Sequence, residues 1–353
     1  MTGSIASKKT ELRYPWMFGK SVDTLFFFAP VLLGVGLVFT HNIFNHAGWL
    51  WTFLILNAFG AGPLHQGATW FAYFDKKNRE YFVSTPANRF IFFFGPPLII
   101  IASVFAAIYA LQLFVAIGMI WALQHIVQQN IGILLLYHNH GRGEAIVARP
   151  LEARTQQFAA CTFFLIFFYR VFLLGRAGEI VLPVIAVFAL YTTFLIVKYL
   201  RTLGQQLRQG SYLNVPAFLF WCLSVLCLWP MAFVVNSFAE GYLIPVTVHW
   251  SQYLILNYVL VKNKYSEEQL KNICIPRPLL LLFSVCVTLL AINLFLQFGF
   301  DALTKHKLFL GICFGLMNGI GLVHFFQDAF LWRFRDPYLR QAILPHLMSE
   351  RSL

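Results

Sequence analysis

The segment 308–332, LFLGICFGLMNGIGLVHFFQDAFLW, decides the class of protein to which the chain belongs. Its first 20 residues carry no charge, and Asp328 is its only ionised side chain. A helix needs about 20 apolar residues to cross a bilayer. The segment therefore predicts a membrane-spanning helix with a histidine, an amide and a carboxylate in its interior.

The rest of the chain has the same character. Of its 353 residues 59% are hydrophobic and 11% are charged, and Phe occurs 39 times. A water-soluble domain carries about 25% charged residues. This composition excludes a soluble enzyme and a disordered protein. It leaves no room for a separate soluble domain, so we expect residues 1–353 to form a single integral membrane domain.

We predict an all-α, polytopic transmembrane helix bundle of about ten spans. The first apolar run lacks a small-residue cleavage site, so we expect it to be retained as a membrane anchor. The ten expected spans are 23–40, 48–74, 89–108, 111–137, 157–174, 179–200, 214–235, 241–261, 277–299 and 308–332.

Lysine and arginine residues orient these spans. With the N-terminus in the cytoplasm, 22 of the 26 fall in cytoplasmic segments. Positive charge favours the cytoplasmic side, so we expect cytoplasmic N- and C-termini in a cell (inner) membrane. The charges are spread over six segments and form no stripe, which argues against nucleic acid as a partner. Anionic lipid headgroups suit them better.

Four histidines occupy the interior of even-numbered spans. His65, His125, His249 and His324 lie nine to thirteen residues from the cytoplasmic end of the second, fourth, eighth and tenth spans. At 1.5 Å per residue this difference is about 6 Å, close to one helical turn. The four imidazoles are thus predicted to share one layer in the cytoplasmic half of the membrane.

Three of these histidines have a glutamine three residues later, on the same helix face. The glutamines are Gln128, Gln252 and Gln327, and Asp328 follows His324 by one turn. We interpret the glutamines as groups that orient metal ligands. Asp328 is either another such group or a further ligand, and Tyr253 is a candidate proton donor.

This layer has three interpretations. Imidazoles without thiolates suit a mononuclear non-haem iron centre with open positions for oxygen. Haem fits poorly, because two stacked haems would place histidines in two layers on shared helices, whereas this chain has one layer with one histidine per helix. A transporter would also collect His, Asp and Gln, but it predicts polar residues continuing to both faces. In a purely structural bundle each histidine would bond a neighbouring helix. His138 and His140 form an H-x-H sequence that is able to ligate a metal, but this pattern is common by chance, and we expect it to lie in a solvated loop.

The motifs resemble two families. The opening YPWMFGKSVDTLFFFAP, H-x-x-Q-Q-x-x-G-I-x-x-L-Y and the closing H-F-x-x-D-x-x-x-W-R are similar to a group of uncharacterised, histidine-rich, multi-pass bacterial membrane proteins. The chain also resembles, in architecture, the bacteriorhodopsin-related membrane carotene dioxygenases. That resemblance implies a histidine-ligated mononuclear iron. Their Pro-His-Gly-Ala-x-Asp signature is only echoed by Pro63-Leu64-His65-Gln66-Gly67-Ala68, so carotene cleavage is not carried over.

The sequence thus predicts a membrane oxygenase with iron bound by His65, His125, His249 and His324. Its expected partners are a lipid or other hydrophobic small molecule, molecular oxygen and an electron donor. The alternatives are a transporter or proton- or metal-conducting protein, and a structural helix bundle.

Overall fold

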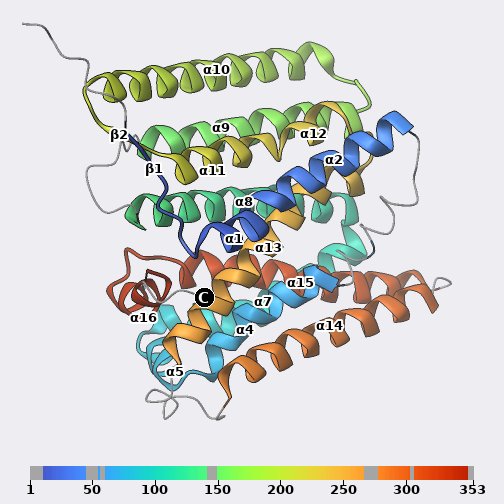
Figure 1. The fold of residues 1–353 in the computed structure, drawn as a ribbon. Coiled ribbons are helices and arrows are strands. Elements are labelled where there is room, and N and C mark those ends of the chain that lie inside the picture. The colour runs from blue at the N-terminus through green and yellow to red at the C-terminus, as the bar shows by residue number, and fades with distance from the viewer. Residues whose placement is uncertain are drawn as a thin grey trace, which may run out of the picture. The chain divides into compact units, whose positions relative to one another are not determined.

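The computed structural model describes residues 11–44, 55, 60–140, 149–265, 277–302 and 306–348. Nearly all of this part of the chain is helical, as Figure 1 shows, which confirms the predicted all-α class. Two three-residue strands, β1 (Glu11–Arg13) and β2 (Tyr212–Asn214), pair in parallel. Residues 48–54 and 56–59 of the expected second span lie outside the described residues.

The chain divides into two compact units. The first comprises residues 1–54, 126–249 and 351–353, and the second comprises 55–125 and 250–350. Helices α8 (Leu111–His140) and α13 (Phe238–Lys264) each contribute to both units. The expectation of a single domain stays a prediction, and each unit is described by itself.

The first unit contains the N-terminal helices and the middle of the chain. Helices α9 and α10 pack against each other, and α12 packs against α9. Besides parts of α8 and α13, the helices are α1 (Lys20–Asp23), the π-helix η1 (Thr24–Phe28), α2 (Ala29–Phe44), α9 (Arg149–Phe167), the π-helix η5 (Phe168–Phe172), α10 (Gly178–Arg208), α11 (Val215–Leu226) and α12 (Trp229–Phe233).

The second unit contains His65, His125 and His324, three of the four histidines that the sequence predicts as metal ligands. Its main packing pairs are α7 with α15 and α4 with α14. Besides parts of α8 and α13, the helices are α4 (Gly62–Phe71), the 3-10 helix η3 (Ala72–Phe74), α5 (Lys76–Val83), α6 (Pro86–Arg89), the π-helix η4 (Phe90–Phe94), α7 (Gly95–Tyr109), α14 (Pro278–Ala302), α15 (Lys307–Leu331) and α16 (Pro337–Leu347).

Seven helical segments of the described chain are long and apolar enough to cross a membrane, so the chain is a membrane protein. The expected span 157–174 corresponds to α9 with η5, and 241–261 to α13, but neither is among the seven. Both are long enough; their polar residues reduce their hydropathy. The seven segments are Lys20–Thr40, Pro86–Tyr109, Leu111–His140, Gly178–Arg208, Val215–Phe233, Pro278–Phe298 and Lys307–Leu331.

Glycines allow the main helix pairs of the second unit to approach closely. A Cβ atom on Gly315 of α15 would lie 2.5 Å from the Cα of Val104 on α7. On α4, a Cβ atom on Gly67 would lie 2.5 Å from the Cα of Cys286 on α14. Small residues at such contacts let backbones pack by van der Waals forces in a membrane, where lipid is as apolar as the helices.

We expect Gly315→Ala to reduce the free energy of unfolding by about 1–3 kcal/mol, because the new methyl group meets backbone that cannot rotate away. Gly118→Ala is the matched control, since a Cβ atom there meets nothing within 4 Å. Thermal unfolding of detergent-purified protein measures both. Equal midpoints for the two variants would contradict the close packing of α7 and α15.

A buried polar cluster lies in the first unit, where α8, α9 and α10 meet. Glu152 of α9 is bonded to His138 Nε2 at 2.9 Å, and the Tyr199 hydroxyl donates to its other oxygen at 3.0 Å. Both Glu152 and His138 are buried. The expectation of a solvated loop for His138 is therefore wrong, because α8 continues to His140 and the imidazole has a buried carboxylate to pair with.

Glu152→Ala is expected to cost about 3 kcal/mol of unfolding free energy, because it leaves a buried imidazole and a buried hydroxyl without their acceptor. Glu179→Ala, at an exposed position of α10, should stay within about 0.5 kcal/mol of the wild type. Chemical or thermal unfolding in detergent provides the comparison. A Glu152 variant as stable as the Glu179 variant would show that the cluster contributes nothing.

Candidate functional site

Helix geometry brings four polar side chains of the second unit onto two facing stripes. His65 and Thr69 lie four residues apart on α4, and His324 and Asp328 lie four residues apart on α15. Residues at this spacing share a helix face. All four are buried, so the two helices present their polar stripes to the interior of the unit.

Three imidazoles and one carboxylate meet there. The ring centre of His324 lies 4.5 Å from that of His65 and 5.0 Å from that of His125. A carboxylate oxygen of Asp328 lies 3.7 Å from His324 Nδ1, and the other lies 3.9 Å from His125 Nε2. We call His65, His125, His324 and Asp328 the His/Asp cluster.

Two hydroxyl groups hold the carboxylate. The Tyr253 hydroxyl donates to Asp328 Oδ1 at 2.8 Å, and the Thr69 hydroxyl donates to the same oxygen at 3.0 Å. Thr69 Oγ1 also lies 2.6 Å from His324 Nδ1. A hydroxyl has a single proton, so if Thr69 donates to Asp328 it accepts from Nδ1–H. In that tautomer His324 has its lone pair on Nε2, the nitrogen suited to bind a metal.

The donor set fits a transition metal. One ligand atom each from His125, His324 and Asp328 can be chosen so that all lie within 4.8 Å of one another. The separation of His125 Nε2 from Asp328 Oδ2, 3.9 Å, is shorter than twice a metal–nitrogen distance of about 2.1 Å. Hydrogen bonds from Thr69 and to Thr69 fix ligand orientation, as surrounding groups do in metal sites.

The buried carboxyl group of Asp328 gives the cluster its chemical character. Its side chain is 4% exposed, and no lysine or arginine pairs with it in the described part of the chain. An ionised carboxylate in such a place needs a compensating positive charge. Two imidazoles face it, and a divalent metal held between them would supply that charge.

The other predicted site residues differ in burial and in their partners. His249 is buried and is the last residue of the first unit. Gln128 is exposed, so its spacing from His125 does not bring it into the interior. Gln252 is buried, and Gln327 is buried with its amide donating to the Tyr73 hydroxyl. Tyr253 contacts Asp328 directly.

Thr69, which contacts the His/Asp cluster, is the site residue that sequence reasoning missed. Its hydroxyl contacts Tyr253, His324 and Asp328. The available signal was its position four residues after His65. A threonine within an apolar run is common, however, and its hydroxyl bonds its own helix as readily as a neighbouring one.

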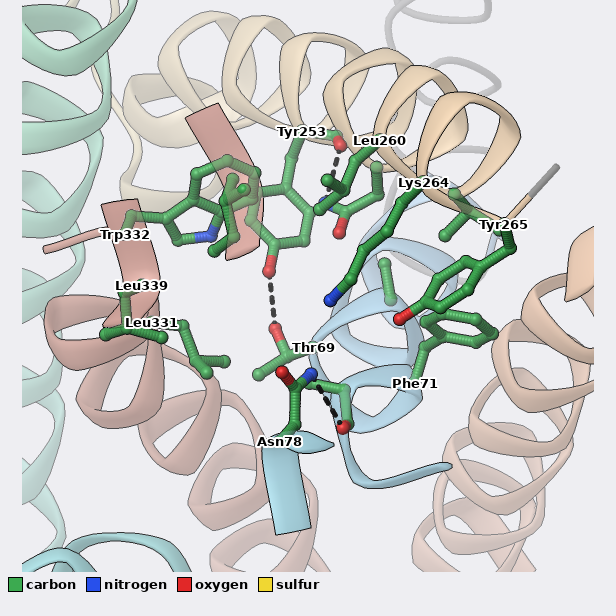
Figure 2. A pocket seen from close by; sticks show the side chains of 15 residues that line it. Thr69, Phe71, Asn78, Tyr253, Leu260, Lys264, Tyr265, Leu331, Trp332 and Leu339 are labelled. Atoms are coloured by element: carbon green, nitrogen blue, oxygen red, sulfur yellow. Dashed lines mark hydrogen bonds between the residues drawn. The ribbon is translucent and has the colours of Figure 1, made fainter. Parts of the chain in front are cut away.

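A pocket borders the cluster in the second unit, with a volume of about 40 Å³, room for two or three water molecules. Thr69 and Tyr253 form one part of its wall, and Lys264 and Asn78 form another, as Figure 2 shows. The remaining lining residues are mostly apolar. The hydroxyls that hold Asp328 therefore also face a space that a small group can enter.

Lys264, at the end of α13, is paired with Asp75 at 2.9 Å. Asp75 also caps α5 by accepting from the backbone N–H groups of Lys77 and Asn78, and it accepts from the Tyr265 hydroxyl. Burial raises the pKa of Asp75, but the Lys264 ammonium and the Tyr265 hydroxyl outweigh it. The pKa of this carboxyl consequently lies below its usual 3.8.

The lowered pKa of Asp75 predicts a pH dependence. Its contribution to stability is present above the unfolded-state pKa of about 3.9 and is lost as pH falls through the lower folded-state pKa. Lys264→Met should therefore cost about 2–4 kcal/mol at pH 7, and the difference from wild type should shrink below about pH 4.

Unfolding midpoints of both proteins between pH 7 and pH 3 check this. Lys262→Met, at an exposed position two residues earlier, is the control and should show no such trend. A Lys264→Met penalty that stayed constant over the whole range would exclude the ion pair as its cause.

No family model, curated protein or solved structure matches the chain. The residues of the His/Asp cluster and of the adjoining pocket are therefore the basis on which a function is inferred.

Proposed function

We propose that this protein is an integral membrane, metal-dependent oxygenase with a mononuclear non-haem iron, acting on a lipid or isoprenoid-like hydrophobic substrate. His125, His324 and Asp328 would hold the metal, with His65 beside His324 as a further ligand. His249, predicted from the sequence as a metal ligand, would be the fourth histidine. The support comes from the residues of the His/Asp cluster.

One observation carries the proposal: a buried carboxylate faces two imidazoles and has no lysine or arginine partner among the described residues. Two histidines and one carboxylate with open positions are typical of non-haem iron oxygenases. Zinc sites of structural type are instead closed by four ligands and commonly include cysteine. In the described part of the chain, the groups that could bind a metal here are imidazole nitrogens and carboxylate oxygens, without a cysteine.

The chain's own residues would position and insulate this centre. Thr69 and Tyr253 orient Asp328 through the hydrogen bonds described above. Phe325 stacks on His125, with ring centres 4.6 Å apart, and restricts its rotation. Iron, when bound, would supply the binding and activation of oxygen, with electrons from a separate donor. Tyr253, in contact with both Asp328 and the pocket, is placed to pass a proton toward the reacting group.

The membrane setting suits such a substrate. The proposal includes about ten spans with both termini in the cytoplasm of a bacterial cell, in its inner membrane, as the positive charges predict. Many apolar side chains on the spanning helices are exposed, Leu190 on α10 and Phe295 on α14 among them. Their lipid surroundings would deliver a hydrophobic molecule laterally to the bundle.

Elemental analysis of detergent-purified protein tests the proposal. We expect about one equivalent of iron per chain, lost in His125→Ala, His324→Ala and Asp328→Asn because each removes one ligand of a small set. His65→Ala and His249→Ala should reduce metal content as well. His306→Ala, at an exposed position, and His138→Ala, in the Glu152 cluster, should retain it.

Folded protein that takes up no metal when iron(II) is added anaerobically would overturn the proposal. In that case the transport alternative would be examined by proton flux in proteoliposomes, comparing wild type with Asp328→Asn. If the His/Asp cluster is purely structural, wild type will show neither iron uptake nor proton flux. Asp328→Asn will then lower only the unfolding midpoint.

A further inference from the structure

The pocket beside the His/Asp cluster has a mixed lining. Its apolar part includes Phe71, Leu260, Leu331 and Ile343. Its polar part consists of Thr69, Asn78, Tyr253, Asn257, Lys264 and Tyr265. Pockets of this kind, with apolar walls and a few placed polar groups, are characteristic of small-molecule sites.

The polar groups converge on one space. Figure 2 shows the Lys264 ammonium and the hydroxyls of Tyr253 and Thr69 directed toward the middle of the pocket. An ammonium has three donors, and the structure assigns one of them to Asp75. Lys264 therefore retains hydrogen-bonding capacity toward a bound group.

The net charge of this polar end is zero. The positive charge of Lys264 is matched by Asp75 at 2.9 Å, and Asp75 is itself held by Tyr265 and two backbone N–H groups. A bound carboxylate would add a second anion to a single cation in a largely buried place. Such an anion loses its hydration without gaining an unpaired positive charge. A neutral oxygen group avoids this cost.

We propose that the pocket binds the neutral, oxygen-bearing end of an amphiphile, an alcohol or carbonyl group, by a hydrogen bond from Lys264. About 40 Å³ accommodates that polar end and its first carbon atoms, while the remaining chain lies along apolar walls and lipid. This inference rests on the proposed function, because it names the substrate class of that site.

The position of the pocket places the reacting carbon near the polar end. Tyr253 and Thr69 separate the pocket from Asp328 by a single layer of side chains, since each hydroxyl bonds to Oδ1 of Asp328. Carbon atoms next to the bound oxygen group are therefore the ones closest to the His/Asp cluster. Oxidation by molecular oxygen, with electrons from the donor named in the proposed function, is expected there and not in the middle of the substrate chain.

Quenching of Trp332 fluorescence tests the pocket directly, because Trp332 lines it. The probes are 2-bromododecan-1-ol and 2-bromododecanoate, whose bromine lies beside the head group. The Trp332→Phe variant supplies the background from the other eight of the nine tryptophans. We expect the alcohol to bind wild type about tenfold more tightly than the carboxylate, after correction for partition into detergent.

Two variants test the reason for that preference. Lys264→Met should weaken alcohol binding about tenfold, the loss of one hydrogen bond to a charged donor, whereas Lys262→Met should not. Asp75→Asn keeps a side chain suited to cap α5 but leaves Lys264 without its anion. This variant should bind the carboxylate more tightly than the alcohol.

The proposal is overturned if quenching in wild type equals that in Trp332→Phe, or if Asp75→Asn leaves the preference unchanged. Iron content is measured on the same samples. Alcohol binding without iron would contradict the oxygenase and leave the pocket assignment standing. Iron without alcohol binding would contradict the pocket assignment alone.

Discussion

The hydrogen bonds that Tyr253 and Thr69 donate to Asp328 are the interaction on which the second unit depends. They join α4, α13 and α15 at one carboxylate oxygen. Asp328 could not remain buried without them, because a carboxylate deprived of donors loses several kcal/mol of solvation. The same bonds aim the carboxylate at two imidazoles. One arrangement therefore both supplies hydrogen bonds to the buried carboxylate and directs it toward groups that could bind a metal.

The sequence predicted the helical class and most of the membrane-crossing helices, because long apolar runs have few other stable structures in lipid. It also predicted that Asp328 lies on the face of His324, which follows from helical periodicity alone. Residue counts to the predicted cytoplasmic ends placed His65, His125 and His324 in one layer together with His249. The structure places the ring of His324 in contact with those of His65 and His125.

Other features could not be predicted, because they depend on how helices rotate and pair. Gln128 keeps its helical spacing from His125 but is exposed, since a three-residue step rotates a side chain by about 60° from its starting direction. Glu152 lies in a charged segment that the sequence predicts to be cytoplasmic, yet its carboxylate is buried against His138. Thr69 and Lys264 gain their roles from partners at least 184 residues away along the chain. Periodicity within a single helix contains no information about such pairs.

X-ray absorption spectroscopy of the iron-loaded protein tests the metal centre most directly. If His125, His324 and Asp328 bind the iron, we expect a shell of nitrogen and oxygen ligands at about 2.0–2.2 Å. The imidazole scattering should decrease in His125→Ala and His324→Ala. A shell containing sulfur at about 2.3 Å, or a spectrum of hydrated iron that neither substitution alters, would contradict it.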